Sequence, residues 1–120
     1  MPGYHEIRMQ FGGDDGEPWF VIHRGEEILA LMIRAEKNPN IHATPAEVWV
    51  GAEDPLLIWG ERLAKHTEAL PVYVSPREGA DYELQGRFTV TDRERTNIEL
   101  INAVHAVGYG LSRIVFLKEA

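Results

Sequence analysis

The chain has 120 residues, a length typical of one domain, and we expect a single domain over residues 1–120. Its formal net charge of −7 argues against a protein that binds nucleic acid through a broad positive surface. The absence of cysteine excludes disulfides, thiolate catalysis and cysteine zinc sites. A reducing, cytoplasmic location suits this composition.

The first part of the chain predicts three short strands. We expect them over residues 5–10, 19–23 and 28–35, with the glycine and aspartate cluster at 12–16 forming the turn after the first. The third run has apolar residues facing both ways, which favours a central strand. A helix is the alternative for this run, because leucine, alanine and methionine favour helices.

An irregular connection follows from Lys37 to Pro45. Its two prolines and two asparagines prevent a continuing helix or strand. Loops held by a rigid scaffold often carry function. Asn38, Asn40 and His42 are therefore candidates to hydrogen-bond the edge of a ligand, and the alternative is that the asparagines only close turns.

Two predicted strands place an aromatic ring on the face away from their valines. Trp49 alternates with the valines of residues 48–51, and Tyr73 with those of residues 72–74. One interpretation is that both faces of the sheet are covered and the rings belong to the core. The other is that Trp49 and Tyr73 line a concavity in which a flat apolar ligand stacks.

A helix is predicted to begin at Asp54-Pro55, with aspartate as the N-cap and proline in the first turn. Trp59 and Leu63 recur at helical spacing and would bury one side. Gly60 weakens this helix by about 1 kcal/mol relative to alanine, and a close packing contact would explain it. Trp59 is either a core residue or a surface on which a ligand stacks.

Residues 82–90 alternate as a half-buried strand, with Gly86 either at a bulge or at a close approach of a ligand. The face expected to be buried carries Tyr82, Leu84, Gly86, Phe88 and Val90. The hairpin loop before this strand would expose Arg77 at its tip.

A last helix is predicted near residues 96–107 and a closing strand at 113–117. The total is about seven strands and two helices without strict alternation, which is typical of the α+β class. We expect a small, strongly curved mixed β-barrel.

The sequence shows no motif of a known catalytic or metal site. It has no glycine-rich phosphate loop, no His-Glu-x-x-His and no Gly-x-Ser-x-Gly. Asp14, Asp15 and Glu17 lack the ligand spacing of an EF-hand loop. Asp81 and Glu83 have strand spacing, but Gln85 stands where a metal-dependent nuclease usually carries lysine. We therefore predict no enzymatic activity, no cofactor and no metal.

Three segments resemble PUA/SRA-like domains, which accompany HNH-type restriction endonucleases and read modified bases in DNA. They are Val48-Trp-Val-Gly, Pro71-Val-Tyr-Val and Tyr82-Glu-Leu-Gln-Gly-Arg-Phe-Thr-Val, within residues 47–92. The resemblance implies a curved barrel whose cavity holds a base extruded from the helix. It also implies a partner subunit that supplies the nuclease.

The same resemblance implies roles for individual residues of this sequence. Aromatic stacking would fall to Trp49 and Tyr73, with Trp59 as a further ligand contact, and edge reading to Asn38, Asn40 and His42. Phosphate contacts would fall to Arg77 and Arg87. The implied function is a non-enzymatic reader of a modified or flipped base in nucleic acid.

Two other functions agree with the sequence. The acidic charge and the lack of a catalytic motif also fit a protein-interaction or regulatory module, for example a homodimer. A small-ligand barrel, or an enzyme with an unrecognised carboxylate or histidine site, is the third alternative.

Overall fold

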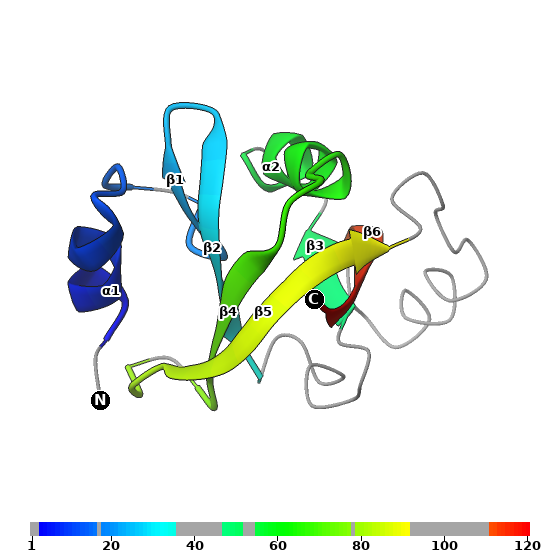
Figure 1. The fold of residues 1–120 in the computed structure, drawn as a ribbon. Helices are drawn as coiled ribbons and strands as arrows, with labels where there is room; N and C mark the ends of the chain where they lie inside the picture. The colour runs from blue at the N-terminus through cyan, green and yellow to red at the C-terminus, as the bar shows by residue number, and fades with distance from the viewer. Residues whose placement is uncertain (1–2, 17, 36–46, 52–54, 78, 92–110) are drawn as a thin grey trace.

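The structure, a computed structural model, describes residues 3–16, 18–35, 47–51, 55–77, 79–91 and 111–120. These residues form two helices and one six-stranded sheet, so the predicted α+β class is confirmed (Figure 1). In chain order the elements are α1 (Tyr4–Phe11), β1 (Val21–Arg24), β2 (Glu27–Arg34), β3 (Glu47–Gly51), α2 (Leu56–Ala64), β4 (Leu70–Ser75), β5 (Glu83–Thr91) and β6 (Leu111–Glu119).

The sheet has the strand order β1-β2-β4-β5-β6-β3. All neighbours are antiparallel except β2 and β4, which run parallel. Strands β1 and β3 are the two edges, and the described sheet does not close into the predicted barrel. No helix within the described ranges is both long and apolar enough to cross a membrane.

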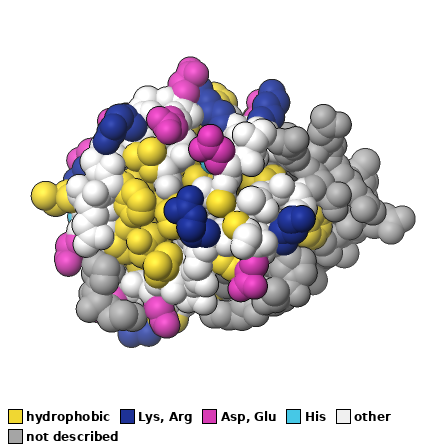
Figure 2. Space-filling model, in the orientation of Figure 1, with side chains coloured by type: hydrophobic (Ala, Val, Ile, Leu, Met, Phe, Trp, Pro, Cys, Tyr) yellow, Lys and Arg dark blue, Asp and Glu magenta, His cyan; other side chains and the backbone are white. Residues whose placement is uncertain are grey.

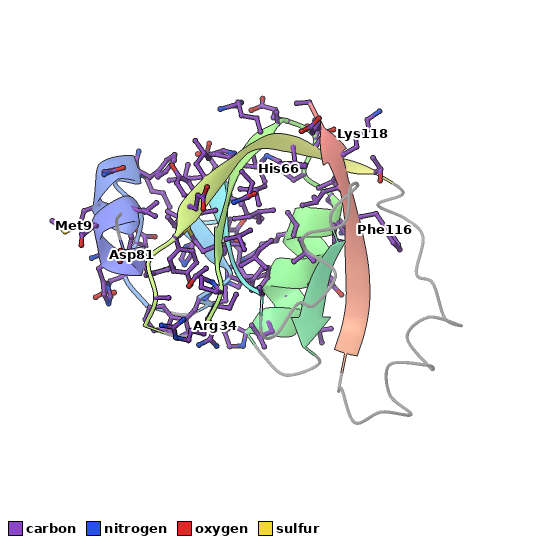
Figure 3. The ribbon with its side chains drawn as sticks, turned by 90° about the horizontal axis from the view of Figure 1, so that it is seen from below. Met9, Arg34, His66, Asp81, Phe116 and Lys118 are labelled. Carbon is purple, nitrogen blue, oxygen red and sulfur yellow. The ribbon has the colours of Figure 1, made fainter. Side chains whose placement is uncertain are left out.

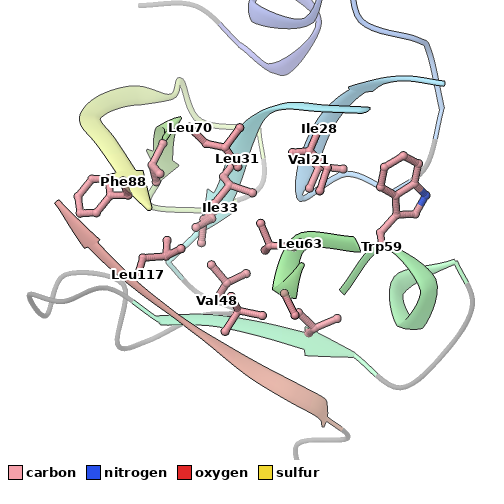
Figure 4. Close-up of a cluster of buried hydrophobic side chains, with 14 of the residues drawn as sticks. Val21, Ile28, Leu31, Ile33, Val48, Trp59, Leu63, Leu70, Phe88 and Leu117 are labelled. Carbon is pink, nitrogen blue, oxygen red and sulfur yellow. The ribbon is translucent and has the colours of Figure 1, made fainter. Parts of the chain in front are cut away.

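One face of the sheet curves around a large core, which we call the inner core (Figure 4). Both edge regions contribute to it, since Val21 of β1 and Val48 of β3 are members of the same cluster. Helix α2 supplies Trp59, Leu63 and Ala64, and it contacts β3 and β6. The helix therefore packs inside the curve of the sheet, as the spacing of Trp59 and Leu63 predicts.

Helix α1 covers the opposite face of the sheet and makes a second core, the outer core. Its buried members are Ile7, Ile22, Ala30, Met32 and Tyr82, with Tyr4, Phe11, Leu29 and Tyr73 packed against them. Both faces of the sheet near β2 and β4 are thus covered. The continuous apolar run of β2 follows from this double burial, and the strand interpretation of residues 28–35 is confirmed.

The strand predicted at residues 5–10 is wrong, because this segment is helix α1. Tyr4, Ile7 and Phe11 recur at helical spacing and face the sheet together. Gly12 ends the helix at φ 65°, and its N–H donates to carbonyl oxygens of the last turn. The alternation of polar and apolar residues at 5–10 is typical of a strand. The apolar residues at helical spacing begin one residue earlier, at Tyr4.

The predicted common face of residues 82–90 is also wrong, because the strand changes face at a bulge. Tyr73 pairs with Leu84 and Val72 with Gly86, so one residue of β5 has no partner between them. Gly86 has φ 128°, a backbone conformation that side chains disfavour. Consequently Tyr82 packs in the outer core, Phe88 in the inner core, and Leu84 is 54% exposed.

The remaining predicted elements agree in type and differ in extent. The strand expected from Trp19 begins at Val21, the helix expected from Asp54-Pro55 begins at Leu56, and the closing strand is longer than predicted. The helix predicted at residues 96–107 lies outside the described residues.

Candidate functional site

The parallel pairing of β2 and β4 brings the end of β2 and the start of the loop that carries Arg77 to one end of the sheet. Arg34 is the register partner of Ser75, and the N–H of Ala35 donates to the Ser75 carbonyl oxygen at 2.8 Å. The chain that carries Asn38, Asn40 and His42 leaves the described region here, and the loop that carries Arg77 begins here. We call this place the β2–β4 end. Open sheets commonly bind ligands beyond the carboxyl ends of parallel strands.

The loop after β4 is held by hydrogen bonds from a buried serine. The Ser75 hydroxyl donates to the Arg77 carbonyl oxygen at 2.8 Å and lies 3.1 Å from the Ala80 carbonyl oxygen. The N–H of Ala80 donates to the Arg77 carbonyl oxygen at 3.2 Å. The Arg77 residue is exposed. Arg77 is therefore exposed to solvent next to backbone that these hydrogen bonds hold.

Three aromatic residues, Tyr4, His5 and Trp19, form what we call the aromatic corner. The ring centroids of Tyr4 and Trp19 are 5.2 Å apart, those of Tyr4 and His5 5.6 Å, and those of His5 and Trp19 6.2 Å. Trp19 is 46% exposed and His5 is also exposed. The Tyr4 hydroxyl donates to the Val21 carbonyl oxygen at 3.1 Å, which fixes α1 to the edge strand.

The aromatic corner lies toward the same end of the molecule. Strand β1 is antiparallel to β2, and the N–H of Met32 donates to the Phe20 carbonyl oxygen at 2.8 Å. Trp19 therefore precedes the part of β1 that lies next to the end of β2. Viewed from this end, Asp81 lies beside α1, and Arg34 lies between α1 and α2 (Figure 3).

Tyr82 connects the aromatic corner to the chain that follows the Arg77 loop. The pKa of Tyr4 is raised to about 12, mainly by burial; the nearby Arg8 opposes this increase, and Tyr82 and Asp15 make smaller contributions to it. Tyr82 directly follows the Arg77 loop and belongs to the outer core against which Tyr4 packs. The loop and the corner are thus joined through one cluster.

We expect the stability of the protein to fall above pH 10 because of Tyr4. The folded state holds this phenol protonated up to about pH 12, whereas an unfolded tyrosine ionises near pH 10. The stabilisation is therefore complete below pH 10 and is lost as pH rises from 10 to 12. Tyr4→Phe removes the titration together with a hydrogen bond that contributes about 1 kcal/mol.

The measurement is the free energy of unfolding of the wild type and Tyr4→Phe at pH 8 and pH 11. The wild type should be the more stable protein at pH 8, and the difference should shrink at pH 11. A difference that stays constant would show that Tyr4 titrates normally.

The structure places two predicted stacking residues in the cores. Tyr73 packs against the outer core, with its ring 6.2 Å from that of Phe11 and nearly perpendicular to it. Trp59 is 6% exposed in the inner core. Its ring centroid lies 4.3 Å from that of His23, and the guanidinium of Arg62 lies 4.5 Å from it. These contacts agree with the alternative in which both rings are core residues.

The structure does not bring Trp49 beside Tyr73. Trp49 lies in β3 opposite Ile114, and its side chain is outside what the structure describes. Strands β5 and β6 separate β3 from β4, a gap of three strand spacings or about 14 Å along a flat sheet. The two residues therefore do not lie on neighbouring strands.

Arg87 lies at the other end of β4 from Arg77. It is the register partner of Pro71, and its guanidinium donates to the Ala69 carbonyl oxygen at 3.1 Å. The two arginines are separated by the length of β4, so one short phosphate segment would not contact both. The positions of Asn38, Asn40 and His42 lie outside the described residues.

The aspartates of the first turn have a structural role in this fold. The Asp14 carboxylate accepts from the N–H of Gly25 at 2.7 Å, and the Asp14 N–H donates to the His23 carbonyl oxygen at 2.6 Å. Within the described part of the chain, no three potential ligand side chains gather into a metal site.

The aromatic corner is the part of the site that sequence reasoning missed. The predicted strands begin at His5 and at Trp19, and they leave Tyr4 outside any element. The available signal was the helical spacing of Tyr4, Ile7 and Phe11, which would have turned Tyr4 toward the sheet. No protein-family model, curated protein or solved structure matches this chain.

Proposed function

We propose that the protein is a non-enzymatic reader of a modified or flipped base in nucleic acid, and that it binds the base at the β2–β4 end. One observation carries the proposal. The parallel pairing of β2 and β4 brings the start of the Arg77 loop beside the end of β2, and Asn38, Asn40 and His42 follow β2 in the sequence. The curved sheet would then be an open form of the PUA/SRA-like barrel that the sequence resembles.

Each part of the site has a distinct role in this proposal. The half-exposed ring of Trp19 takes the place of Trp49 and Tyr73 as the surface on which a base stacks, an interaction of about 1–3 kcal/mol. Asn38, Asn40 and His42 would read the edge of the base. Arg77 would contact a phosphate, which positions the strand without specifying its sequence. A partner subunit would add any nuclease activity.

Binding should depend only weakly on salt, because few cations are available for phosphates. One phosphate contact, from Arg77 to a single strand, predicts a slope of log affinity against log salt of about −0.7. Tryptophan fluorescence can be titrated with short single strands and duplexes, plain and carrying modified cytosines or thymines, at two salt concentrations. Saturable quenching that prefers a modified strand supports the proposal, and no binding to any nucleic acid would refute it.

We expect Arg77→Ala to weaken binding to all oligonucleotides alike, by about threefold to tenfold, and to reduce the salt slope by about 0.7. The reason is the loss of one exposed phosphate contact at the β2–β4 end. Arg87→Ala is the matched control, because it removes an exposed arginine at the far end of β4. Equal losses in the two variants would mean that the strand does not bind where we place it.

The outer face supports a second candidate, an acidic protein-interaction module. Met9 of α1 is 71% exposed and Leu84 of β5 is 54% exposed. Figure 2 shows hydrophobic side chains gathered beside α1, with charged side chains around them. The mass of the purified protein in solution distinguishes this candidate. A stable dimer that Met9→Glu or Leu84→Glu dissociates, combined with no binding to nucleic acid, would favour it.

A further inference from the structure

We infer that residues 3–14 act as a strap that closes the β1 edge of the sheet, and that release of this strap lets two copies of the chain pair through β1. The inference concerns the edge of the sheet and is independent of the proposed function. An open edge strand presents unpaired N–H and carbonyl groups, to which a strand of another molecule can bond. In the folded chain the strap occupies the outward carbonyl groups of β1.

Alternate residues of β1 direct their backbone groups away from β2. The N–H of Met32 in β2 donates to the Phe20 carbonyl oxygen, so Phe20 bonds toward β2 and the next residue, Val21, faces outward. His23 follows two residues later and also faces outward, because its carbonyl oxygen accepts from Asp14 rather than from β2. A further strand added to this edge would therefore bond to Val21 and His23.

Both outward carbonyl oxygens accept hydrogen bonds from the strap. The Tyr4 hydroxyl donates to the Val21 carbonyl oxygen at 3.1 Å, and the Asp14 N–H donates to the His23 carbonyl oxygen at 2.6 Å. The Asp14 carboxylate also accepts from the N–H of Gly25, directly after β1, at 2.7 Å. The strap therefore holds β1 at both ends and takes the place of a further strand.

A glycine lets the strap lie directly against this edge. A Cβ atom at Gly13 would lie 2.5 Å from Cγ2 of Ile22 and 3.3 Å from the His23 carbonyl oxygen. Ile22 is fully buried, so its side chain has little room to move away. A larger residue at position 13 would therefore push the strap away from β1.

The strap can leave the edge at a lower cost than an element of the inner core. Helix α1, which joins its two contact points, has a single fully buried residue, Ile7. The exposed Arg24 guanidinium adds hydrogen bonds to the carbonyl oxygens of Phe11 and Gly12 at 3.2 Å. Segments with few buried apolar contacts open locally before the core does. Two copies could then bond through the freed edges in one symmetric, antiparallel pair.

Proline at position 14 releases one contact of the strap, and asparagine provides the matched control. Asp14→Pro removes the N–H that donates to His23 and the carboxylate that accepts from Gly25. Asp14→Asn can keep both hydrogen bonds and removes the same negative charge. With Tyr4→Phe in both proteins, sedimentation velocity should show about tenfold tighter self-association for the proline variant than for the asparagine variant.

Gly13→Val is a second test that leaves every charge of the chain in place. Its side chain would meet Ile22 and the His23 carbonyl oxygen, so this variant should also associate more strongly than the wild type. Hydrogen exchange measured by NMR identifies the surface that pairs. Pairing through β1 should protect the outward amides of Val21 and His23 as the protein concentration rises.

Each outcome supports or overturns the inference. Stronger self-association together with protection of the Val21 and His23 amides supports it. Folded variants that associate no more strongly than their controls would overturn it, as would association that leaves these two amides unprotected. Loss of the fold in both the proline variant and Gly13→Val, seen by circular dichroism, would overturn it as well, because the strap would then be part of the core rather than a removable segment.

Discussion

Replacing Leu63 with alanine should lower the free energy of unfolding by about 3 kcal/mol. Leu63 is fully buried in the inner core, in the same cluster as Ile33 of β2 and Val48 of β3 (Figure 4). Truncation removes its contacts with strands from both halves of the curved sheet. Since small domains are stable by only about 5–15 kcal/mol, this loss is a large fraction of the total. Urea denaturation followed by circular dichroism measures it.

Leu57→Ala is the matched control, because Leu57 belongs to the same helix but is 37% exposed. The two variants change helix propensity in the same way and differ in the burial of the removed atoms. We expect Leu57→Ala to cost less than about 1 kcal/mol. Similar costs for the two variants would mean that α2 does not pack inside the curve of the sheet.

The sequence predicts the sheet better than it predicts the helix that covers it. Strands β2 and β4 can be recognised in the sequence because both of their faces are covered. Strands of this kind carry runs of apolar residues, and such runs are visible without any knowledge of the fold. Helix α1 has only one residue, Ile7, that is fully buried, so its helical pattern of apolar residues is weak. Its polar and apolar residues alternate by chance as they would in a strand. The Gly12-Gly13 ending was the better signal for this helix.

The face of β5 could not be predicted from alternation, because a single bulge reverses it. Gly86 indicated a bulge, but only its pairing with Val72 shows which side chains move to the other face. The candidate site was unpredictable for a related reason. No short sequence pattern indicates that β2 and β4 are parallel neighbours. This pairing determines that Arg77, rather than Arg87, lies at the β2–β4 end.

Gly60→Ala should destabilise the protein by up to about 2 kcal/mol although alanine favours helices. A Cβ atom at this position would lie 2.6 Å from Cγ1 and 3.3 Å from Cβ of Val50 in β3. Val50 is 1% exposed and β-branched, so its side chain has little freedom to move away. Overpacking of this kind costs about 1–3 kcal/mol, against a gain of about 1 kcal/mol in helix propensity. The predicted close packing contact of Gly60 is thus confirmed as the approach of α2 to β3.

A double-mutant cycle with Val50→Ala tests the cause of this cost. Val50→Ala removes the methyl groups that obstruct the new Cβ, so Gly60→Ala in that background should become neutral or stabilising by up to about 1 kcal/mol. The change of sign gives a coupling energy of about 2 kcal/mol between positions 50 and 60, which denaturant unfolding of the four proteins measures. A cost that persists without the Val50 methyl groups would place the obstruction in the backbone of β3. Helix α2 could then approach the sheet this closely only with glycine at position 60. The curve of the sheet would depend on Gly60 rather than on the size of the side chain at position 50.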